Sequence, residues 1–145
     1  MKAFLQSLLT ACCLFVLRPQ NAFCSLTLKV LTPKVKCFEK AEFAILEERT
    51  WCNPFDPSEG KVYLQIRTPS GRILIWPAFY TQDYERRLLK IRGRSQEWIY
   101  PKGRPFWKAR FAPREAGNYE VKAVLEDANG KMFSNSVSFT CTMRR

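Results

Sequence analysis

Apolar and polar residues alternate in short stretches along most of the chain, and this pattern restricts the possible folds more than any other feature of the sequence. In Val62–Ile66, for example, every second residue is a branched aliphatic. Alternation over four to eight residues is typical of a β-strand with one buried face. No stretch keeps the 3.6-residue period of an amphipathic helix. The pattern predicts an all-β protein.

Turn residues separate these stretches at intervals typical of a sandwich or barrel. Thr68–Gly71 lies between Val62–Ile66 and Ile73–Trp76, so we expect a hairpin there. The other predicted strands are Ser25–Thr32, Ala41–Leu46, Trp107–Phe111, Tyr119–Leu125 and a last strand through Phe133, Val137, Phe139 and Cys141. We expect an immunoglobulin-like antiparallel β-sandwich of about seven to eight strands.

One motif supports this sandwich. Glu115–Tyr119 (EAGNY) has the spacing of a tyrosine corner, in which the Tyr hydroxyl bonds backbone a few residues upstream. Val121 occupies the position of the second cysteine of an antibody domain, so no inter-sheet disulfide is expected at this point. The alternative is that Tyr119 is simply buried in a strand. Trp107 is assigned to the core rather than to a ligand surface.

Residues 1–24 have the features of a secretory signal peptide. Lys2 precedes an apolar run, Ala3–Leu17, that is shorter than the roughly 20 residues of a membrane span. Small residues before Ser25 favour cleavage after Cys24. Lipid attachment at Cys12 is less favoured, because the apolar run continues past it, and a retained anchor is the third alternative. We expect a domain of residues 25–145 that is secreted, periplasmic or extracellular, without stable membrane insertion.

The residue composition excludes most catalytic chemistry. The 145 residues include no His, which excludes serine–histidine and cysteine–histidine pairs and histidine-ligated zinc. There is no glycine-rich phosphate loop and no CxxC spacing. We therefore expect no catalytic residue, no metal site, no cofactor and no enzyme activity of this chain. Cleavage would leave Cys37, Cys52 and Cys141, expected as one disulfide or as three buried thiols.

The chain is strongly basic. It has 24 Lys and Arg against 13 Asp and Glu, a net charge of +11, which cleavage of Lys2 and Arg18 would lower to +9. Between Arg86 and Arg114 Glu97 is the single acid among many basic residues. Such a stretch could attract an acidic polysaccharide or another anionic surface. Export argues against nucleic acid, so no nucleic-acid partner is expected. The alternative is that these cations are solvated on strand edges.

Aromatic residues gather in the same region. Pyranose rings stack on exposed aromatics, and sugar hydroxyls bond Asp, Gln and Arg side chains. If the loops of the segment Trp76–Tyr100 lie at one end of the sandwich, their side chains could bind a sugar in this way. The candidate ligand-binding residues are Tyr80, Gln82, Asp83, Tyr84, Arg86, Arg87 and Trp98. The alternatives are that these aromatics fill the core, or that the segment packs against a neighbouring domain.

Four segments also carry a family resemblance. They are Asn53–Pro57, Thr68–Gly71, Pro77–Tyr84 and Pro105–Pro113, the last followed by Glu115, Gly117 and Tyr119. In this order they resemble the immunoglobulin-like domain of unknown function that precedes a (β/α)8 barrel in bacterial glycoside hydrolases of the collagen-binding, apiosidase-like type. The resemblance covers roughly residues 26–142.

The resemblance implies an accessory role. It places the catalytic carboxylates in the barrel, and this chain stops at Met143–Arg145. We expect a non-catalytic module of a secreted carbohydrate-degrading hydrolase, either truncated or stand-alone. Its expected partners are the catalytic barrel or a partner hydrolase and a plant polysaccharide, including acidic uronates. The alternative function is an independent extracellular binding or adhesion module for an anionic polysaccharide or surface.

Overall fold

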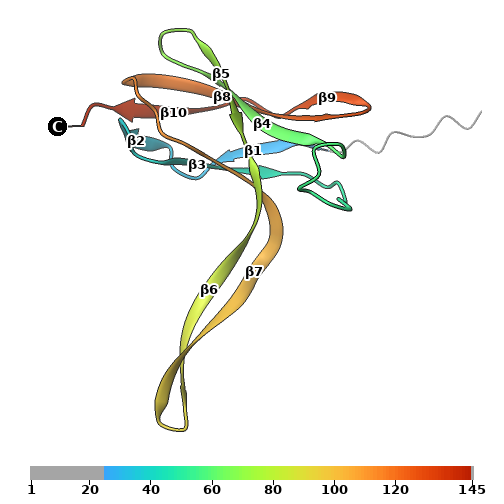
Figure 1. The fold of residues 1–145 in the computed structure, drawn as a ribbon. Helices are drawn as coiled ribbons and strands as arrows, with labels where there is room; N and C mark the ends of the chain where they lie inside the picture. Colours follow the sequence, from blue (N-terminus) through green and yellow to red (C-terminus); the bar gives the residue numbers. More distant parts are fainter. Residues whose placement is uncertain (1–24, 145) are drawn as a thin grey trace, which may run out of the picture.

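The protein is a β-sandwich from which one long hairpin projects (Figure 1). The structure, a computed structural model, describes residues 25–144, so the expected signal peptide lies outside the described residues. Its strands are β1 (Thr27–Val30), β2 (Lys34–Lys36), β3 (Ala41–Leu46), β4 (Lys61–Arg67), β5 (Ile73–Pro77), β6 (Phe79–Ile91), β7 (Arg94–Phe111), β8 (Gly117–Asp127), β9 (Gly130–Phe133) and β10 (Val137–Thr142). This described part has no helix, and hence none able to cross a membrane.

The strands form two sheets. One sheet has the order β1-β3-β7-β6, and the other has the order β2-β10-β8-β4-β5, with β9 also paired to β8. All pairs are antiparallel except β2 with β10. This is the ABED and GFC order of an immunoglobulin domain, with β5 added beside β4 and β2 added beside β10. The sandwich expected from the sequence is confirmed.

The core lies between the two inner faces. Burial alternates along β4, where Val62, Leu64 and Ile66 point inward, as the sequence pattern predicts. Phe43 of one sheet meets Phe139 of the other with ring centroids 5.5 Å apart. The predicted hairpin of β4 and β5 is also confirmed, since Gln65 pairs with Ile75 across it.

The predicted last strand is wrong, because it is broken in two. Phe133 ends β9 and Val137 begins β10. The Ser134 hydroxyl accepts a bond from the backbone N–H of Ala123 at 2.8 Å in place of a regular ladder contact. Next to it, the Asn135 side chain bonds both backbone groups of Leu28 in β1, at 2.9 and 3.1 Å. The break makes β9 a separate strand, and the structure also contains the short strand β2. The ten strands within residues 25–144 therefore exceed the seven to eight expected.

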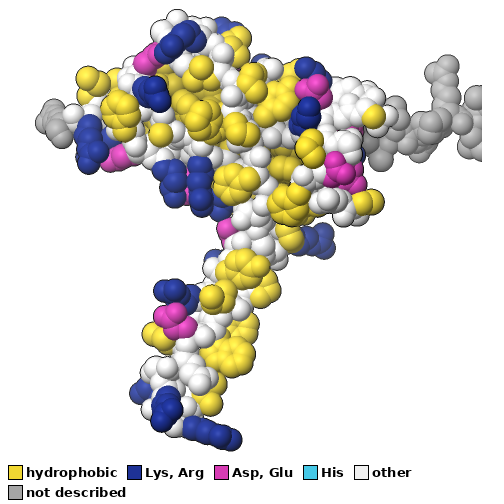
Figure 2. All heavy atoms as spheres, viewed as in Figure 1, with side chains coloured by type: hydrophobic (Ala, Val, Ile, Leu, Met, Phe, Trp, Pro, Cys, Tyr) yellow, Lys and Arg dark blue, Asp and Glu magenta, His cyan; other side chains and the backbone are white. Residues whose placement is uncertain are grey.

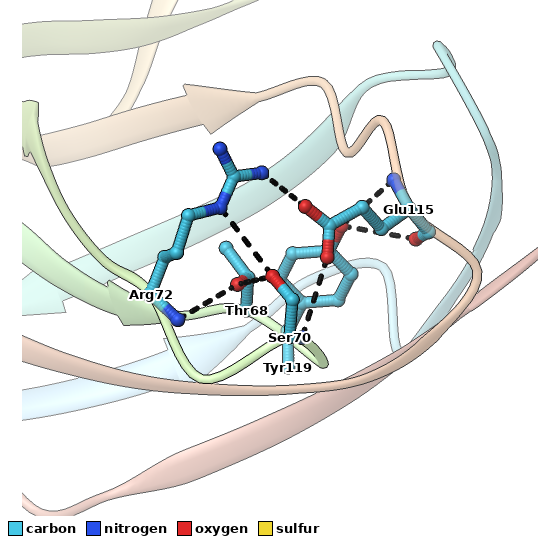
Figure 3. Close-up of polar contacts among 5 residues, drawn as sticks. All are labelled: Thr68, Ser70, Arg72, Glu115 and Tyr119. Carbon is cyan, nitrogen blue, oxygen red and sulfur yellow. Dashed lines mark hydrogen bonds and ion pairs between the residues drawn. The ribbon is translucent and has the colours of Figure 1, made fainter.

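The tyrosine corner is present at the start of β8 (Figure 3). The Tyr119 hydroxyl donates to the carbonyl of Glu115 at 2.9 Å and accepts from its N–H at 3.1 Å. The Glu115 carboxylate in turn pairs with Arg72 and accepts from the N–H of Ser70. The corner therefore links the β7–β8 connection to the β4–β5 turn. Burial raises the pKa of Tyr119, whose ring is almost completely buried.

Candidate functional site

The β6–β7 hairpin leaves the sandwich as a two-stranded ribbon (Figure 1). Near the sandwich, β7 pairs with β3 over Trp107–Phe111. Farther out, β6 and β7 pair only with each other, from Asp83 opposite Lys102 to Ile91 opposite Arg94. Residues 83–102 are the ribbon. The condition that the segment Trp76–Tyr100 forms loops at one end of the sandwich is therefore not met, because paired strands occupy most of it. The sequence of the ribbon lacks the alternation that marks a strand with one buried face.

The tip of the ribbon is a tight turn of well-defined type. Arg92 and Gly93 both have positive φ, 50° and 79°. Positive φ at both central residues defines the type I′ turn, whose twist matches that of a β-hairpin. The Arg-Gly sequence therefore closes the ribbon with two residues and keeps its two strands in register to the end.

A bulge separates the ribbon from the sandwich. The register shifts between Thr81 and Asp83, opposite residues 102–106 of β7. The Gln82 amide fills the gap and donates to the carbonyls of Lys102 and Gly103 at 2.9 and 3.2 Å. The Asp83 carboxylate accepts from the Lys108 ammonium at 2.8 Å. Bulges bend a strand, so this one redirects the hairpin away from the sheet. The polar groups of Gln82 and Asp83 thus bond other parts of the protein.

Both faces of the ribbon carry exposed apolar side chains. Successive residues of a strand point to opposite faces, and directly paired residues share a face. One face therefore holds Tyr84, Leu88 and Ile99, which are 61%, 70% and 62% exposed. The other holds Leu89, Ile91, Trp98 and Tyr100, which are less exposed, at 37–45%. Figure 2 shows hydrophobic side chains following the hairpin from the sandwich toward its tip.

The predicted ligand-binding residues are therefore not brought together. Tyr80 lies at the root of the hairpin, and Gln82 and Asp83 lie in the bulge. Tyr84 and Arg86 share one face of the ribbon, and Arg87 and Trp98 share the other. One sugar ring could not stack on Tyr84 and Trp98 together, because the ribbon lies between them. Individual roles for these residues remain predictions.

The arginines in the middle of the ribbon form ion pairs, whereas the cations around its tip do not. Arg87 makes two bonds to Glu85, both 3.1 Å, and holds the pKa of that carboxyl below its usual range. Arg86 pairs with Glu97 at 3.5 Å. Within residues 25–144, three cations around the tip have no carboxylate within ion-pair distance: Lys90, Arg92 and Arg94. Figure 2 shows the basic side chains gathered there.

A chain of aromatic rings supports the root of the hairpin. Trp107 is buried, as expected, with Trp51 and Tyr80 edge-on at 5.4 Å each. Phe55 continues the chain at 6.2 Å from Tyr80. Beside it lies an open apolar groove of about 520 Å³, with Phe55, Tyr80 and Ile75 in its lining. The groove lies at the root of the hairpin, on the sandwich side of the bulge.

A second, more polar depression lies on the other side of Tyr80. It has a volume of about 790 Å³ and is lined partly by Glu47, Trp51 and Phe106. The Trp51 indole N–H donates to the Glu47 carboxylate, whose pKa is raised by burial. Arg49 covers the Trp51 ring at 4.4 Å and pairs with Asp127 at 2.7 Å. The Glu47 carboxylate and the Arg49 guanidinium thus bond within the protein, and they stabilise the loop after β3.

Sequence reasoning missed Glu47, Trp51 and Phe55, because this loop has no periodic pattern to mark it. The sequence pattern also did not predict a ribbon with apolar side chains on both faces. Adjacent apolar residues such as Leu88 and Leu89 are the signal that could have indicated it. The described residues contain no group of three His, Cys, Asp or Glu side chains placed to hold a metal ion.

Fold and hairpin define the class of this protein: an immunoglobulin-like sandwich domain with a projecting β-ribbon. Residues 34–126, more than half of the chain, match the model of a family described as a domain of unknown function (DUF5060). The chain belongs to this family. The curated protein sequences include none that matches it.

Proposed function

We propose that this chain is a non-catalytic accessory module of a secreted carbohydrate-degrading protein, and that its ribbon docks on the catalytic domain. One observation carries the docking role: the ribbon exposes apolar side chains on both faces. Within residues 25–144 no other strand pairs with it.

Physical arguments favour a partner for the ribbon. An isolated two-stranded hairpin is only marginally stable in water, so a ribbon of this length gains stability from a surface that covers it. Contiguous exposed apolar surface marks interaction sites. Trp98, Tyr100 and Arg87 are of the residue types that contribute most to binding energy at protein interfaces. Because both faces are apolar, a groove that holds the ribbon on two sides would bury more of it than a flat surface.

The carbohydrate part of the proposal is supported by the sequence resemblance to modules that precede a (β/α)8 barrel. In such a protein the reaction would belong to barrel carboxylates, and this chain would position the barrel or shape the rim of its cleft. Gln82 and Asp83 then act within the module, because they hold the bulge that sets the direction of the ribbon.

The docking role is tested by titrating the mature chain with a separately produced apiosidase-like barrel. Ile99→Ser, on the ribbon, should weaken binding by about ten-fold or more. Ile73→Ser is the matched control, because Ile73 on β5 is equally exposed, at 62%. Equal effects of both variants, or no binding of the wild-type chain, would contradict docking through the ribbon.

The unpaired tip cations favour a second function, binding of an anionic polysaccharide such as a uronate. Titration with neutral and acidic plant oligosaccharides at two salt concentrations tests it. This function requires salt-sensitive binding to uronates alone, lost when Lys90, Arg92 and Arg94 are replaced by Ser. It leaves the apolar faces of the ribbon unexplained, and for that reason we rank it second.

A further inference from the structure

Two buried cysteines of the sandwich are in contact. The Sγ atoms of Cys37 and Cys141 lie 3.2 Å apart, although the residues are 104 positions apart in the sequence. Their exposed fractions are 4% and 2%, whereas Cys52 is exposed. The expectation of three buried thiols is therefore wrong for Cys52. Two sulfurs at this distance can bond after a small movement, whereas two thiols that merely lie in the same core cannot.

The backbone holds the two residues in place from several directions. β2 runs parallel to β10 with Val35 opposite Cys141, and the N–H of Cys37 donates to the carbonyl of Thr142 at 2.8 Å. Directly after Cys37 the chain turns through Phe38, whose φ is 67° and whose N–H bonds the carbonyl of Pro113 at 2.8 Å. The positions from which the two thiols project are thus fixed by the folded sheet.

We propose that Cys37 and Cys141 form a disulfide that fastens β2 to β10 when the chain folds in the presence of a disulfide oxidant. An S–S bond is about 2.05 Å long, so the sulfurs must approach by about 1 Å, which small side-chain rotations can provide. Each thiol loses a proton and the pair loses two electrons. These reduce the disulfide of an oxidant such as glutathione disulfide to two thiols.

Burial also determines when the bond can form. It raises the pKa of Cys141 to about 12, so this group stays a thiol in the folded protein. Thiol–disulfide exchange needs the thiolate. Both thiols are also almost completely buried, so an external disulfide cannot reach either of them in the folded protein. From this burial we infer that oxidation precedes the final closure of the core, and that a chain folded in the reduced state resists later oxidation. Cys52, which is exposed, serves as the accessible thiol for comparison.

Peptide mapping identifies the bond directly. The full chain is refolded with reduced and oxidised glutathione, its free thiols are alkylated, and it is digested with trypsin without reduction. The proposal predicts a linked species of residues 37–40 and 132–144, while residues 50–61 carry an alkylated Cys52. Cleavage after Lys and Arg leaves Cys12, Cys13 and Cys24 in another peptide. A bond mapped to any other pair, or alkylation of both Cys37 and Cys141, would overturn the proposal.

Melting temperature supplies a second measurement. Because the bond would close a loop of about 100 residues, the wild-type chain unfolded and refolded in reductant should melt about 10 °C or more below the wild-type chain refolded with the glutathione couple. Cys52→Ser should respond like the wild type. The double variant with Cys37→Ser and Cys141→Ser should not respond to reductant. A wild-type melting temperature that reductant leaves unchanged would contradict the proposal.

Discussion

The Tyr119 hydroxyl holds the connection between β7, in one sheet, and β8, in the other. It bonds both backbone groups of Glu115, whose carboxylate reaches the β4–β5 turn (Figure 3). We expect Tyr119→Phe to lower the free energy of unfolding by about 1–3 kcal/mol, because it leaves these partly buried backbone groups without their partner. Urea denaturation measures the loss.

Tyr63→Phe is the matched control. Its hydroxyl bonds the Glu126 side chain at 3.0 Å near the surface, where water can replace it. A loss of about 0.5 kcal/mol or less is expected there. Equal losses for the two variants would show that the corner has no special role.

The raised pKa of Tyr119 makes the corner sensitive to alkali. A tyrosine whose pKa is higher in the folded state contributes stability that is present below about pH 10 and is lost as the pH rises through its folded pKa. The difference in melting temperature between the wild type and Tyr119→Phe should therefore narrow above about pH 10. A constant difference from about pH 8 to 11 would contradict this.

The place of a residue in the fold can be predicted from the sequence where a single physical requirement, such as burial, determines it. Tyr119 and Trp107 were assigned correctly to corner and core, since a buried aromatic in an alternating stretch has few other places to go. Gln82 was proposed as a ligand residue, and its amide is bonded within the bulge. An amide in an aromatic-rich segment looks the same in the sequence whether its partner is a sugar or a backbone carbonyl.

Among the elements, the break between β9 and β10 shows how one side chain can substitute for a strand. The Asn135 amide bonds Leu28 as a neighbouring strand would, and so links β1 to the other sheet. Asn135→Ala should lower the free energy of unfolding by about 1–2 kcal/mol. Asn118→Ala, which removes an exposed contact with Thr140, should cost less than about 0.5 kcal/mol. Chemical denaturation of both variants tests this, and the reverse order would contradict it.

Strands with one buried face can be predicted from the alternation of apolar and polar residues in the sequence. Strands without a buried face lack this alternation and cannot be predicted in the same way. β4 and β8 alternate because one side of each lies in the core. The ribbon has no buried side, so Leu88 and Leu89, and likewise Trp98, Ile99 and Tyr100, follow one another without alternation. The short β2 has too few residues for any period to emerge.

At the scale of the whole molecule, the sandwich and the ribbon are separable. The core cluster lies entirely within the sandwich, and its partly buried neighbours reach no farther along the hairpin than Tyr80. Replacing Tyr84–Pro101 by Asn-Gly, a two-residue hairpin turn, should join Asp83 to Lys102. We expect the melting temperature to change by less than about 3 °C.

The same variant sharpens the test of docking. It should lose binding to the catalytic barrel while circular dichroism and thermal unfolding show an intact sandwich. Failure of the variant to fold would show that the sandwich depends on the ribbon and that the two are not separable.

The length of the ribbon determines how strongly the charges at its tip interact with the charges of the sandwich. From Asp83 to Ile91 it spans roughly 25 Å, at about 3.3 Å per residue. The Debye length at physiological ionic strength is about 8 Å. The cations at the Arg92–Gly93 turn are therefore largely screened from the charges of the sandwich, and an approaching molecule meets them first. Such charges act mainly on how fast two molecules associate, while apolar contacts along the stem determine how long they stay together.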